Sequence, residues 1–210
     1  MTGSGSALPR TDAQTALPRL HFIRHGETAW SLSGQHTGRT DIALNEQGEQ
    51  DARMLAVPLA AINFSQVFSS PLRRARQTCE LAGLGEGVQI EPDQSEWDYG
   101  DYEGQRPIDI REKRPDWNVF RDGCPGGESP SQISDRADQL IARLRVLDGN
   151  IAVFSHGHFG RVLAARWIAL RVEHAQSFLL STASLSILGY EHNSAAEPAI
   201  VLWNKIEDSR

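Results

Sequence analysis

Hydrophobic residues follow two patterns that alternate along the chain. Short apolar stretches bounded by polar or turn-forming residues predict β-strands at residues 20–23, 67–69, 88–90, 151–154, 184–190 and 200–203. Apolar residues three and four positions apart predict helices that begin near residues 46, 71, 130 and 157. Alternating strands and helices predict an α/β fold, a three-layer α-β-α sandwich with a mostly parallel central sheet.

The starts of two helices carry specific signals. We expect Asn45 to be the N-cap of the first helix, which Pro58 bends or ends. Ser70 is the expected N-cap of the second helix, with Pro71 at its first position. These assignments place Arg74 in the opening turns of the second helix.

Two regions depart from the alternating pattern. Residues 1–19 are rich in Gly, Ser, Thr and Pro and predict a disordered N-terminal tail, with organelle targeting as the alternative. Residues 97–128 mix aromatic, charged, Gly and Pro residues and predict a loop-like insertion that forms a small cap. Residues 20–210, with the insertion, are expected to form a single domain, because a chain of this length builds one core.

Composition and charge limit the kinds of partner and the compartment. The net charge of −6 argues against nucleic-acid binding, and no apolar run is long enough to span a membrane. The N-terminus lacks the apolar core of a signal peptide, and the two cysteines lack metal-ligand spacing. We therefore expect a cytoplasmic protein without a metal or cofactor. Lys113 and Lys205 are the only lysines, so any anion site must be a local cluster of arginines.

The triplet Arg24-His25-Gly26 lies where the first predicted strand meets a loop. A neutral imidazole is a nucleophile, an arginine offers a planar fork of donors, and a glycine lets backbone approach closely. These residue types at a strand end suit phosphoryl transfer.

Two further segments bring cationic groups to the same edge of the sheet. Arg74 lies at a helix start, where free N–H groups and the helix dipole favour an anion. Ser155-His156-Gly157 repeats the strand-to-helix arrangement, so a protonated His156 is expected to hold a phosphate oxygen beside Arg24 and Arg74. Ligands of open α/β sheets bind at the carboxyl ends of the strands, so one shared site with His25 is expected.

These segments together resemble the ordered signatures of the histidine phosphatase superfamily, also called phosphoglycerate mutase-like. The signatures are 24–28, 70–78, Glu96 and 155–157, and the likeness spans roughly residues 20–204. The resemblance implies that His25 is the phosphorylated nucleophile. It also implies that Arg24, Arg74 and His156 form the phosphate pocket, and that Glu96 is the proton donor.

The same resemblance implies further contacts with the substrate. Thr37 and Gly38 look like a phosphate-contacting loop of the family, and Ser31 stands where many members have Asn. The remaining expected substrate contacts are Tyr99, Gly157 and His158. Residues 96–104, 117–124 and 156–158 look similar to the fungal sedoheptulose-1,7-bisphosphatase branch, which implies a sugar phosphate or sugar bisphosphate as substrate.

The insertion is expected to shape the mouth of the substrate pocket, because loops commonly carry specificity. Its aromatic candidates are Trp97, Tyr99, Tyr102, Trp117 and Phe120. Its candidates for holding a second anion are Arg106, Arg111, Arg114 and Arg121. The alternative is a packed surface insertion whose arginines are solvated.

Other functions stay open at this point. His156-Gly157-His158 is a candidate metal pair, but it lacks a further ligand cluster. A mutase is less favoured, because the family's cofactor-dependent mutases have a longer basic insertion between the acid and the second histidine. A non-catalytic binding protein would be expected to have lost a charge or the nucleophile. The expected partner is a small phosphorylated metabolite, and an exposed terminal strand leaves a homodimer open.

Overall fold

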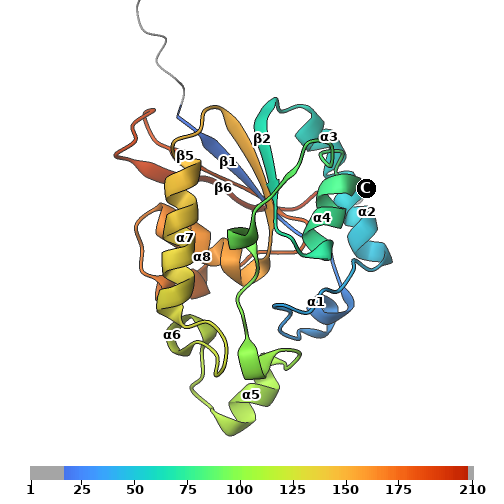
Figure 1. Cartoon of the computed structure of the whole chain (residues 1–210), viewed down its shortest axis with the longest axis vertical. Helices are drawn as coiled ribbons and strands as arrows, with labels where there is room; N and C mark the ends of the chain where they lie inside the picture. The colour runs from blue at the N-terminus through green and yellow to red at the C-terminus, as the bar shows by residue number, and fades with distance from the viewer. Residues whose placement is uncertain (1–16, 208–210) are drawn as a thin grey trace, which may run out of the picture.

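A six-stranded sheet with the order β3-β2-β4-β1-β5-β6 forms the centre of the molecule. The computed structural model describes residues 17–207. The strands are β1 (Arg19–Arg24), β2 (Phe64–Ser69), β3 (Gln89–Ile90), β4 (Asn150–Ser155), β5 (Leu185–Tyr190) and β6 (Pro198–Lys205). Strands β1 to β4 are parallel, whereas β5 is antiparallel to its neighbours β1 and β6. The predicted mostly parallel sheet is confirmed (Figure 1).

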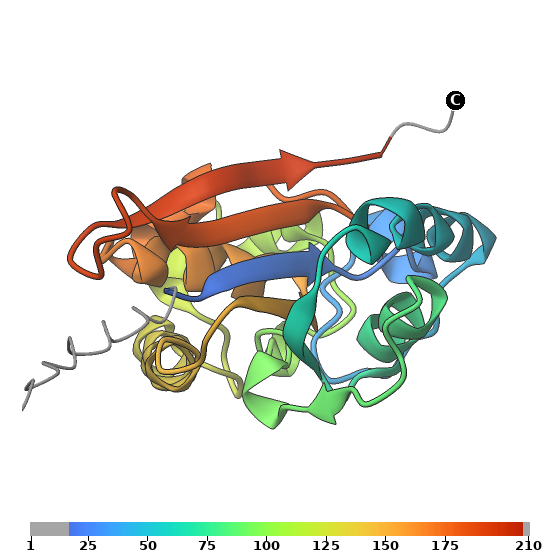
Figure 2. The same ribbon diagram turned by 90° about the horizontal axis from the view of Figure 1, so that it is seen from above.

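Helices cover both faces of this sheet, which gives the predicted three layers (Figure 2). One face packs against α7 (Pro130–Leu144) and α8 (Gly157–Trp167), and the other against α3 (Ala56–Ala60) and α4 (Arg73–Leu81), with α2 (Glu46–Met54) beside α4. Side chains along a strand point alternately to the two faces. Phe22 and Val153 therefore join the core beneath α7 and α8, while Ile23 and Phe154 join the core beneath α3 and α4.

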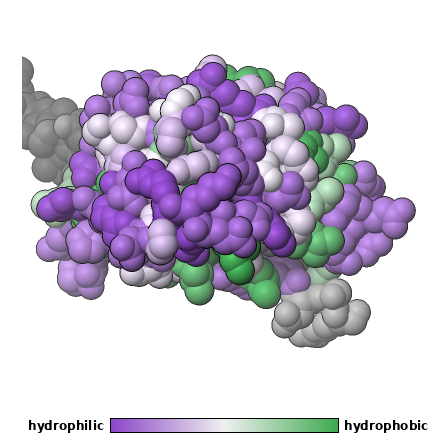
Figure 3. Space-filling model, turned by 90° about the horizontal axis from the view of Figure 1, so that it is seen from below, coloured by the Kyte–Doolittle hydropathy of each residue, from purple (hydrophilic) through white to green (hydrophobic). Residues whose placement is uncertain are grey.

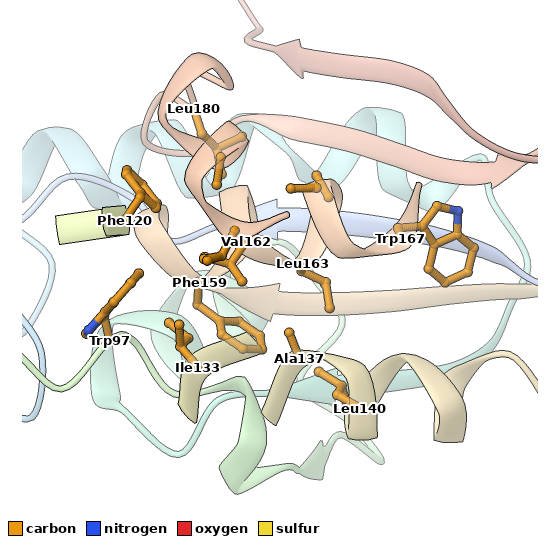
Figure 4. Packing of buried hydrophobic residues seen from close by; sticks show 14 of the residues in the cluster. Trp97, Phe120, Ile133, Ala137, Leu140, Phe159, Val162, Leu163, Trp167 and Leu180 are labelled. Atoms are coloured by element: carbon orange, nitrogen blue, oxygen red, sulfur yellow. The ribbon is translucent and has the colours of Figure 1, made fainter. Parts of the chain in front are cut away.

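The contact between α7 and α8 fixes the start of α8, which lies beside the predicted site. Phe159 and Leu163 of α8 lie among the α7 side chains Ile133, Ala137 and Leu140 (Figure 4), and all five are buried. Burial of such side chains stabilises the folded state by roughly 1.5–3 kcal/mol for each large apolar residue. The apolar stripe predicted for α7 is thus confirmed as a core face.

The first predicted helix begins as expected but ends early. Asn45 is its N-cap, and the Asn45 side chain accepts a hydrogen bond from Gly48 N at 2.8 Å. The helix α2 ends at Met54, before Pro58, which is instead the third residue of the short helix α3. A proline is tolerated there because the first N–H groups of a helix have no partner within it.

The start of α4 differs from the sequence-based prediction. Leu72 is the N-cap and Arg73 the first helical residue, so neither Ser70 nor Pro71 holds the predicted position. A distant side chain supplies the cap, because Asp41 accepts a hydrogen bond from Arg73 N at 2.6 Å. Arg74 still lies in the first turn of α4, as predicted.

The predicted loop-like insertion contains three short helices joined by turns and loops. Residues 97–128 contain η2 (Gly100–Tyr102), α5 (Pro107–Lys113) and α6 (Val119–Asp122). Ile110, Trp117 and Phe120 are buried in the same core cluster as α7 and α8. The insertion is therefore anchored to the main core. The remaining helices are α1 (Ala29–Ser33), η1 (Pro92–Gln94) and η3 (Val172–Ser177).

The predicted tail overlaps the sheet at its last residue. Arg19 begins β1 and pairs with Asn150 of β4, because its backbone continues the ladder of Leu20 and Ile151. Residues 17 and 18 have no regular secondary structure, and residues 1–16, where most of that prediction falls, lie outside the described residues. Within residues 17–207, no helix combines the length and apolarity needed to cross a membrane.

Gly26 permits a close contact between two segments of backbone. A Cβ on Gly26 would lie 2.3 Å from the carbonyl oxygen of Gly48 in α2. We expect Gly26→Ala to lower the free energy of unfolding by about 2 kcal/mol or more, because backbone must shift to relieve the clash. Urea unfolding measures this change. Gly34→Asn is the control, because Gly34 has a left-handed backbone conformation that Asn tolerates, and a Cβ added there would have no atom of another residue within 4 Å apart from its chain neighbours. Equal unfolding free energies for Gly26→Ala and wild type would contradict the expectation.

Candidate functional site

The carboxyl ends of β1 and β4 open into a pocket of about 630 Å³, counting the space at its mouth. The predicted site residues that line it are Arg24, His25, Ser31, Thr37, Glu96, Tyr99, Gly157 and His158. The predicted residues Gly38, Arg74 and His156 do not line this pocket in the described structure. The end of the molecule that carries α1, α5 and α6 is largely hydrophilic, with separate hydrophobic spots (Figure 3).

His25 is a buried, neutral imidazole with one free nitrogen. Its Nδ1 lies 2.7 Å from the carbonyl oxygen of Gly26. A carbonyl only accepts, so Nδ1 carries the hydrogen and Nε2 keeps its lone pair. Burial, and then the charges of Arg74 and Arg24, hold the pKa of His25 well below its usual range. The unprotonated state that phosphoryl transfer requires therefore results from burial more than from the arginines.

The peptide group next to His25 is fixed from α4. Gly26 N donates to Thr78 Oγ1 at 2.9 Å, and the Thr78 hydroxyl donates to the carbonyl of Arg74 at 2.8 Å. Since the Gly26 carbonyl accepts from His25, this chain of hydrogen bonds orients the imidazole.

Arg74 is fully buried and holds other parts of the site in place. Its Nη groups donate to the backbone carbonyls of Thr37, Gly38 and Thr40 at 2.9–3.0 Å. Its Nε donates to His156 Nδ1 at 3.1 Å. Four of its five N–H groups are thus used within the protein, and one on Nη1 is left.

His156 is neutral, which corrects the expectation of a protonated ring. Its Nδ1 accepts from Arg74, so Nε2 carries the hydrogen and donates to Ser70 Oγ at 2.7 Å. Burial, followed by the charge of Arg74, holds the pKa of His156 well below its usual range. The prediction failed because it did not include the hydrogen bond that Arg74 donates to His156 Nδ1.

Arg24 faces the pocket with part of its guanidinium free. Its Nη1 donates to the carbonyl oxygen of Leu180 at 2.5 Å. Its Nε is buried without a hydrogen-bond partner among the described residues. Gly157 leaves room for this side chain, because a Cβ there would lie 3.2 Å from Arg24 Cζ.

Glu96 is tied to the N-terminus of α8. Its Oε1 accepts from Trp97 N at 2.9 Å and from Phe159 N at 2.8 Å, and its Oε2 accepts from His158 N at 3.0 Å. A carboxylate oxygen has two lone-pair positions. Oε1 is therefore saturated, whereas Oε2 keeps one position for a proton or a substrate atom.

Tyr99 and His158 form a hydrogen-bonded pair on the pocket wall. The Tyr99 hydroxyl lies 2.5 Å from His158 Nδ1. Burial is the main cause that raises the pKa of Tyr99 and lowers that of His158. Tyr99 therefore donates to a neutral His158, which leaves the hydrogen of His158 on Nε2.

The three remaining predicted contacts use their polar groups locally. Ser31 Oγ donates to Thr28 O at 3.1 Å and accepts from Thr28 N at 2.8 Å, as part of the α1 cap. Thr37 Oγ1 donates to Gln35 O at 3.2 Å. Gly38 N donates to the Glu103 carboxylate at 2.9 Å. Ser31 and Thr37 line the pocket, but Gly38 does not offer its amide to a ligand in this arrangement.

Sequence reasoning missed three polar residues of the pocket, Gln35, His36 and Arg161. His36 stacks on Tyr99 with ring centroids 4.4 Å apart. Arg161 lies three positions after His158 on α8, a spacing that places both on one helix face. That spacing was the available signal for Arg161, whereas only tertiary packing brings His36 to the pocket.

No cluster of three or more His, Cys, Asp or Glu side chains that could hold a metal ion occurs within residues 17–207. His158 Nδ1 is bonded to Tyr99 and both nitrogens of His156 are engaged. The pair His156-Gly157-His158 thus does not present two free ring nitrogens to a common point.

Four histidines around the pocket, the buried His25, His36 and His156 and the half-buried His158, should make the fold sensitive to mild acid. Burial lowers the pKa of each, for His36 to about 4. The unfolded chain takes up protons near pH 6.5, so stability falls as pH drops from 6.5 toward the folded pKa values. Between pH 7.5 and 5.5 we expect His36 alone to account for a loss of about 1 kcal/mol.

Urea unfolding at pH 7.5, 6.5 and 5.5 measures this pH dependence. His36→Asn should show a smaller fall than wild type, because it removes one of the four titrating rings. The same unfolding free energy at pH 7.5 and 5.5 in the wild type would rule out this effect.

The chain belongs to the histidine phosphatase superfamily, branch 1, whose family model matches residues 20–206. An acid phosphatase of Mycobacterium tuberculosis is 42% identical over 178 residues, which cover 83% of this chain and 87% of that protein. The sedoheptulose 1,7-bisphosphatase of Saccharomyces cerevisiae is 33% identical over 251 residues, covering 88% and 92%. The solved structure of the Mycobacterium tuberculosis open reading frame Rv3214 shows 38% identity and a TM-score of 0.84, covering 90% and 97%.

The family and these phosphatase relatives identify the chain as a phosphoric monoester hydrolase. The family resemblance read from the sequence is thereby confirmed. The roles of the individual residues, the substrate and the cellular compartment stay predictions.

Proposed function

We propose that the chain hydrolyses a small phosphorylated metabolite, a sugar phosphate or sugar bisphosphate, through a phosphohistidine on His25. The observation that carries this proposal is the tautomer of His25. The Gly26 carbonyl holds the hydrogen on Nδ1, so a buried, neutral ring lines the pocket with the lone pair of Nε2 available. Such a nitrogen attacks phosphorus without first losing a proton.

In the first step, Nε2 of His25 bonds to phosphorus while the ester P–O bond breaks in line with it. Glu96, protonated on Oε2, gives that proton to the departing alkoxide, so the product alcohol leaves neutral. Arg24 meets the phosphoryl oxygens with its free N–H groups and offsets the charge that they carry. His158 lies on the same wall and offers Nε2–H as a neutral donor.

In the second step, water replaces the imidazole on phosphorus. The Glu96 carboxylate takes a proton from the water as its oxygen bonds to phosphorus and the N–P bond breaks. His25 returns to its neutral form, Glu96 is protonated again, and inorganic phosphate leaves. Arg74 supports this cycle because it binds the backbone of the 37–40 loop and places its positive charge near His25, and His156 accepts a hydrogen bond from Arg74 Nε.

A panel of sugar phosphates, sugar bisphosphates and phosphoglycerates, incubated with the protein and excess chelator, tests the proposal. We expect release of inorganic phosphate from at least one sugar phosphate, at a rate that the chelator does not change. Transfer of phosphate between positions without release would establish a mutase instead. Loss of activity with the chelator would establish a metal-dependent reaction, and no turnover of any sugar phosphate would refute the proposed substrate class.

A further inference from the structure

A second pocket adjoins the one that contains His25. It has an empty volume of about 660 Å³, counting its mouth, and is lined by residues of α5, α6, α8 and η3. The two pockets share His36, Pro107, His158 and Arg161. We call this second hollow the distal pocket. The shared residues make it a continuation of the reaction pocket.

Arginine side chains line the distal pocket, and no Asp or Glu side chain does so among the described residues. Arg161 donates Nε to Ala175 O at 3.0 Å and Nη2 to Gln176 O at 2.8 Å, while no acceptor for its Nη1 occurs within residues 17–207. Arg111 donates Nε to Trp117 O at 3.2 Å and has no described partner for either Nη group. Neither arginine forms an ion pair in the described part of the chain.

The other three arginines of the insertion are engaged elsewhere. Arg106 pairs with Asp109 at 2.7 Å, and Arg121 pairs with Asp122 at 2.8 Å. Arg114 donates to the Tyr102 hydroxyl at 3.3 Å. None of the three lines the distal pocket, so Arg111 is the insertion arginine that faces it.

The guanidinium of Arg161 is partly shielded from water by its neighbours. Its guanidinium lies over the ring of Phe120, 4.6 Å from the centroid. The Arg161 side chain is half-buried, and burial lowers its pKa. A buried charge is stabilised when an ion of opposite sign reaches it. An anion in the distal pocket would meet Arg161 and Arg111 together.

We propose that the distal pocket binds a second anionic group of the substrate, a phosphate or a carboxylate, through Arg111 and Arg161. The inference rests on the proposed function, because the first phosphate must occupy the pocket of His25. Planar guanidinium groups with free N–H pairs match the oxygens of either anion. The substrate class is therefore a small phosphorylated molecule with a second negative group at its other end.

Steady-state kinetics of Arg111→Gln with three substrates test this proposal. Fructose 1,6-bisphosphate carries a second phosphate, 3-phosphoglycerate carries a carboxylate, and p-nitrophenyl phosphate carries no second anion. We expect KM for one or both doubly anionic substrates to rise about tenfold more than KM for p-nitrophenyl phosphate, with kcat little changed, because a charge-assisted contact is lost. The substrate that responds shows whether the second group is phosphate or carboxylate.

Arg114→Gln is the matched control, because Arg114 lies in the same insertion and does not line the distal pocket. It should leave all three KM values as in the wild type. An equal rise for all three substrates in Arg111→Gln, or no rise, would overturn the inference.

Failure of the proposed function can be told apart from failure of this inference by direct binding. Calorimetric titration of His25→Ala with fructose 1,6-bisphosphate and with 3-phosphoglycerate does not depend on turnover. Adding Arg111→Gln to that variant should raise Kd about tenfold for at least one of the two, as loss of one such contact predicts. Unchanged Kd values for both would overturn the inference even if the protein proves to be a phosphatase.

Discussion

His25→Ala is expected to lower kcat for phosphate release on the order of 10⁴-fold or more, because the residue that forms the covalent intermediate is removed. The intermediate itself gives a direct measurement. Wild-type protein quenched during turnover of a labelled phosphate ester should carry phosphate that is labile in acid and stable in base. His25→Ala should carry none.

His174→Ala controls for the general effect of removing a histidine, because His174 is exposed on η3 and does not line the pocket. It should keep wild-type turnover and phosphoenzyme. Wild-type turnover in His25→Ala would end the proposal of a phosphohistidine. Circular dichroism and urea unfolding show whether the variant is folded, so that a loss of activity can be assigned to chemistry.

Glu96→Gln is expected to slow turnover of alkyl phosphates by roughly 10²–10⁴-fold, because the amide cannot protonate the departing alkoxide. The effect should be much smaller on formation of phosphoenzyme from p-nitrophenyl phosphate, whose leaving group departs without a proton. The phosphoenzyme should then persist, since no carboxylate remains to activate water. Rapid-quench measurements with both kinds of ester separate the two steps.

The leaving group distinguishes a proton donor from a structural carboxylate. Glu96 also accepts hydrogen bonds from Trp97, His158 and Phe159, so its replacement disturbs local structure. A structural disturbance alone would slow both esters by the same factor. Equal slowing of phosphoenzyme formation from the alkyl and the nitrophenyl ester would therefore argue against the assigned role.

The layers of the fold could be predicted from the sequence because apolar stretches mark the strands and apolar residues at helical spacing mark the helices. The short run from Leu20 to Ile23 is buried on both faces of β1, and Ile133 and Ala137 follow the helical period in α7. The helices α5 and α6 could not be predicted in this way, because they are short. Their stability comes from side chains such as Trp117 that pack on the distant main core.

The same distinction holds for the site. His25 and Glu96 line one pocket, as the strand end predicted for His25 and the family resemblance implied for Glu96. The hydrogen bond from Arg74 to His156 Nδ1 could not be predicted from the sequence, because the two residues come from segments far apart along the chain. Protonation depends on such partners, so the state of a buried histidine follows from tertiary structure.

The attachment of Glu96 to the start of α8 has a mechanical consequence. Phe159 anchors α8 among the side chains of α7, and its backbone N–H also holds the Glu96 carboxylate. His158 and Arg161 lie on the same short segment of helix. A small tilt of α8 would therefore displace Glu96 together with His158 and Arg161. Substitutions where α8 packs on α7 are thus expected to change kcat and substrate affinity together.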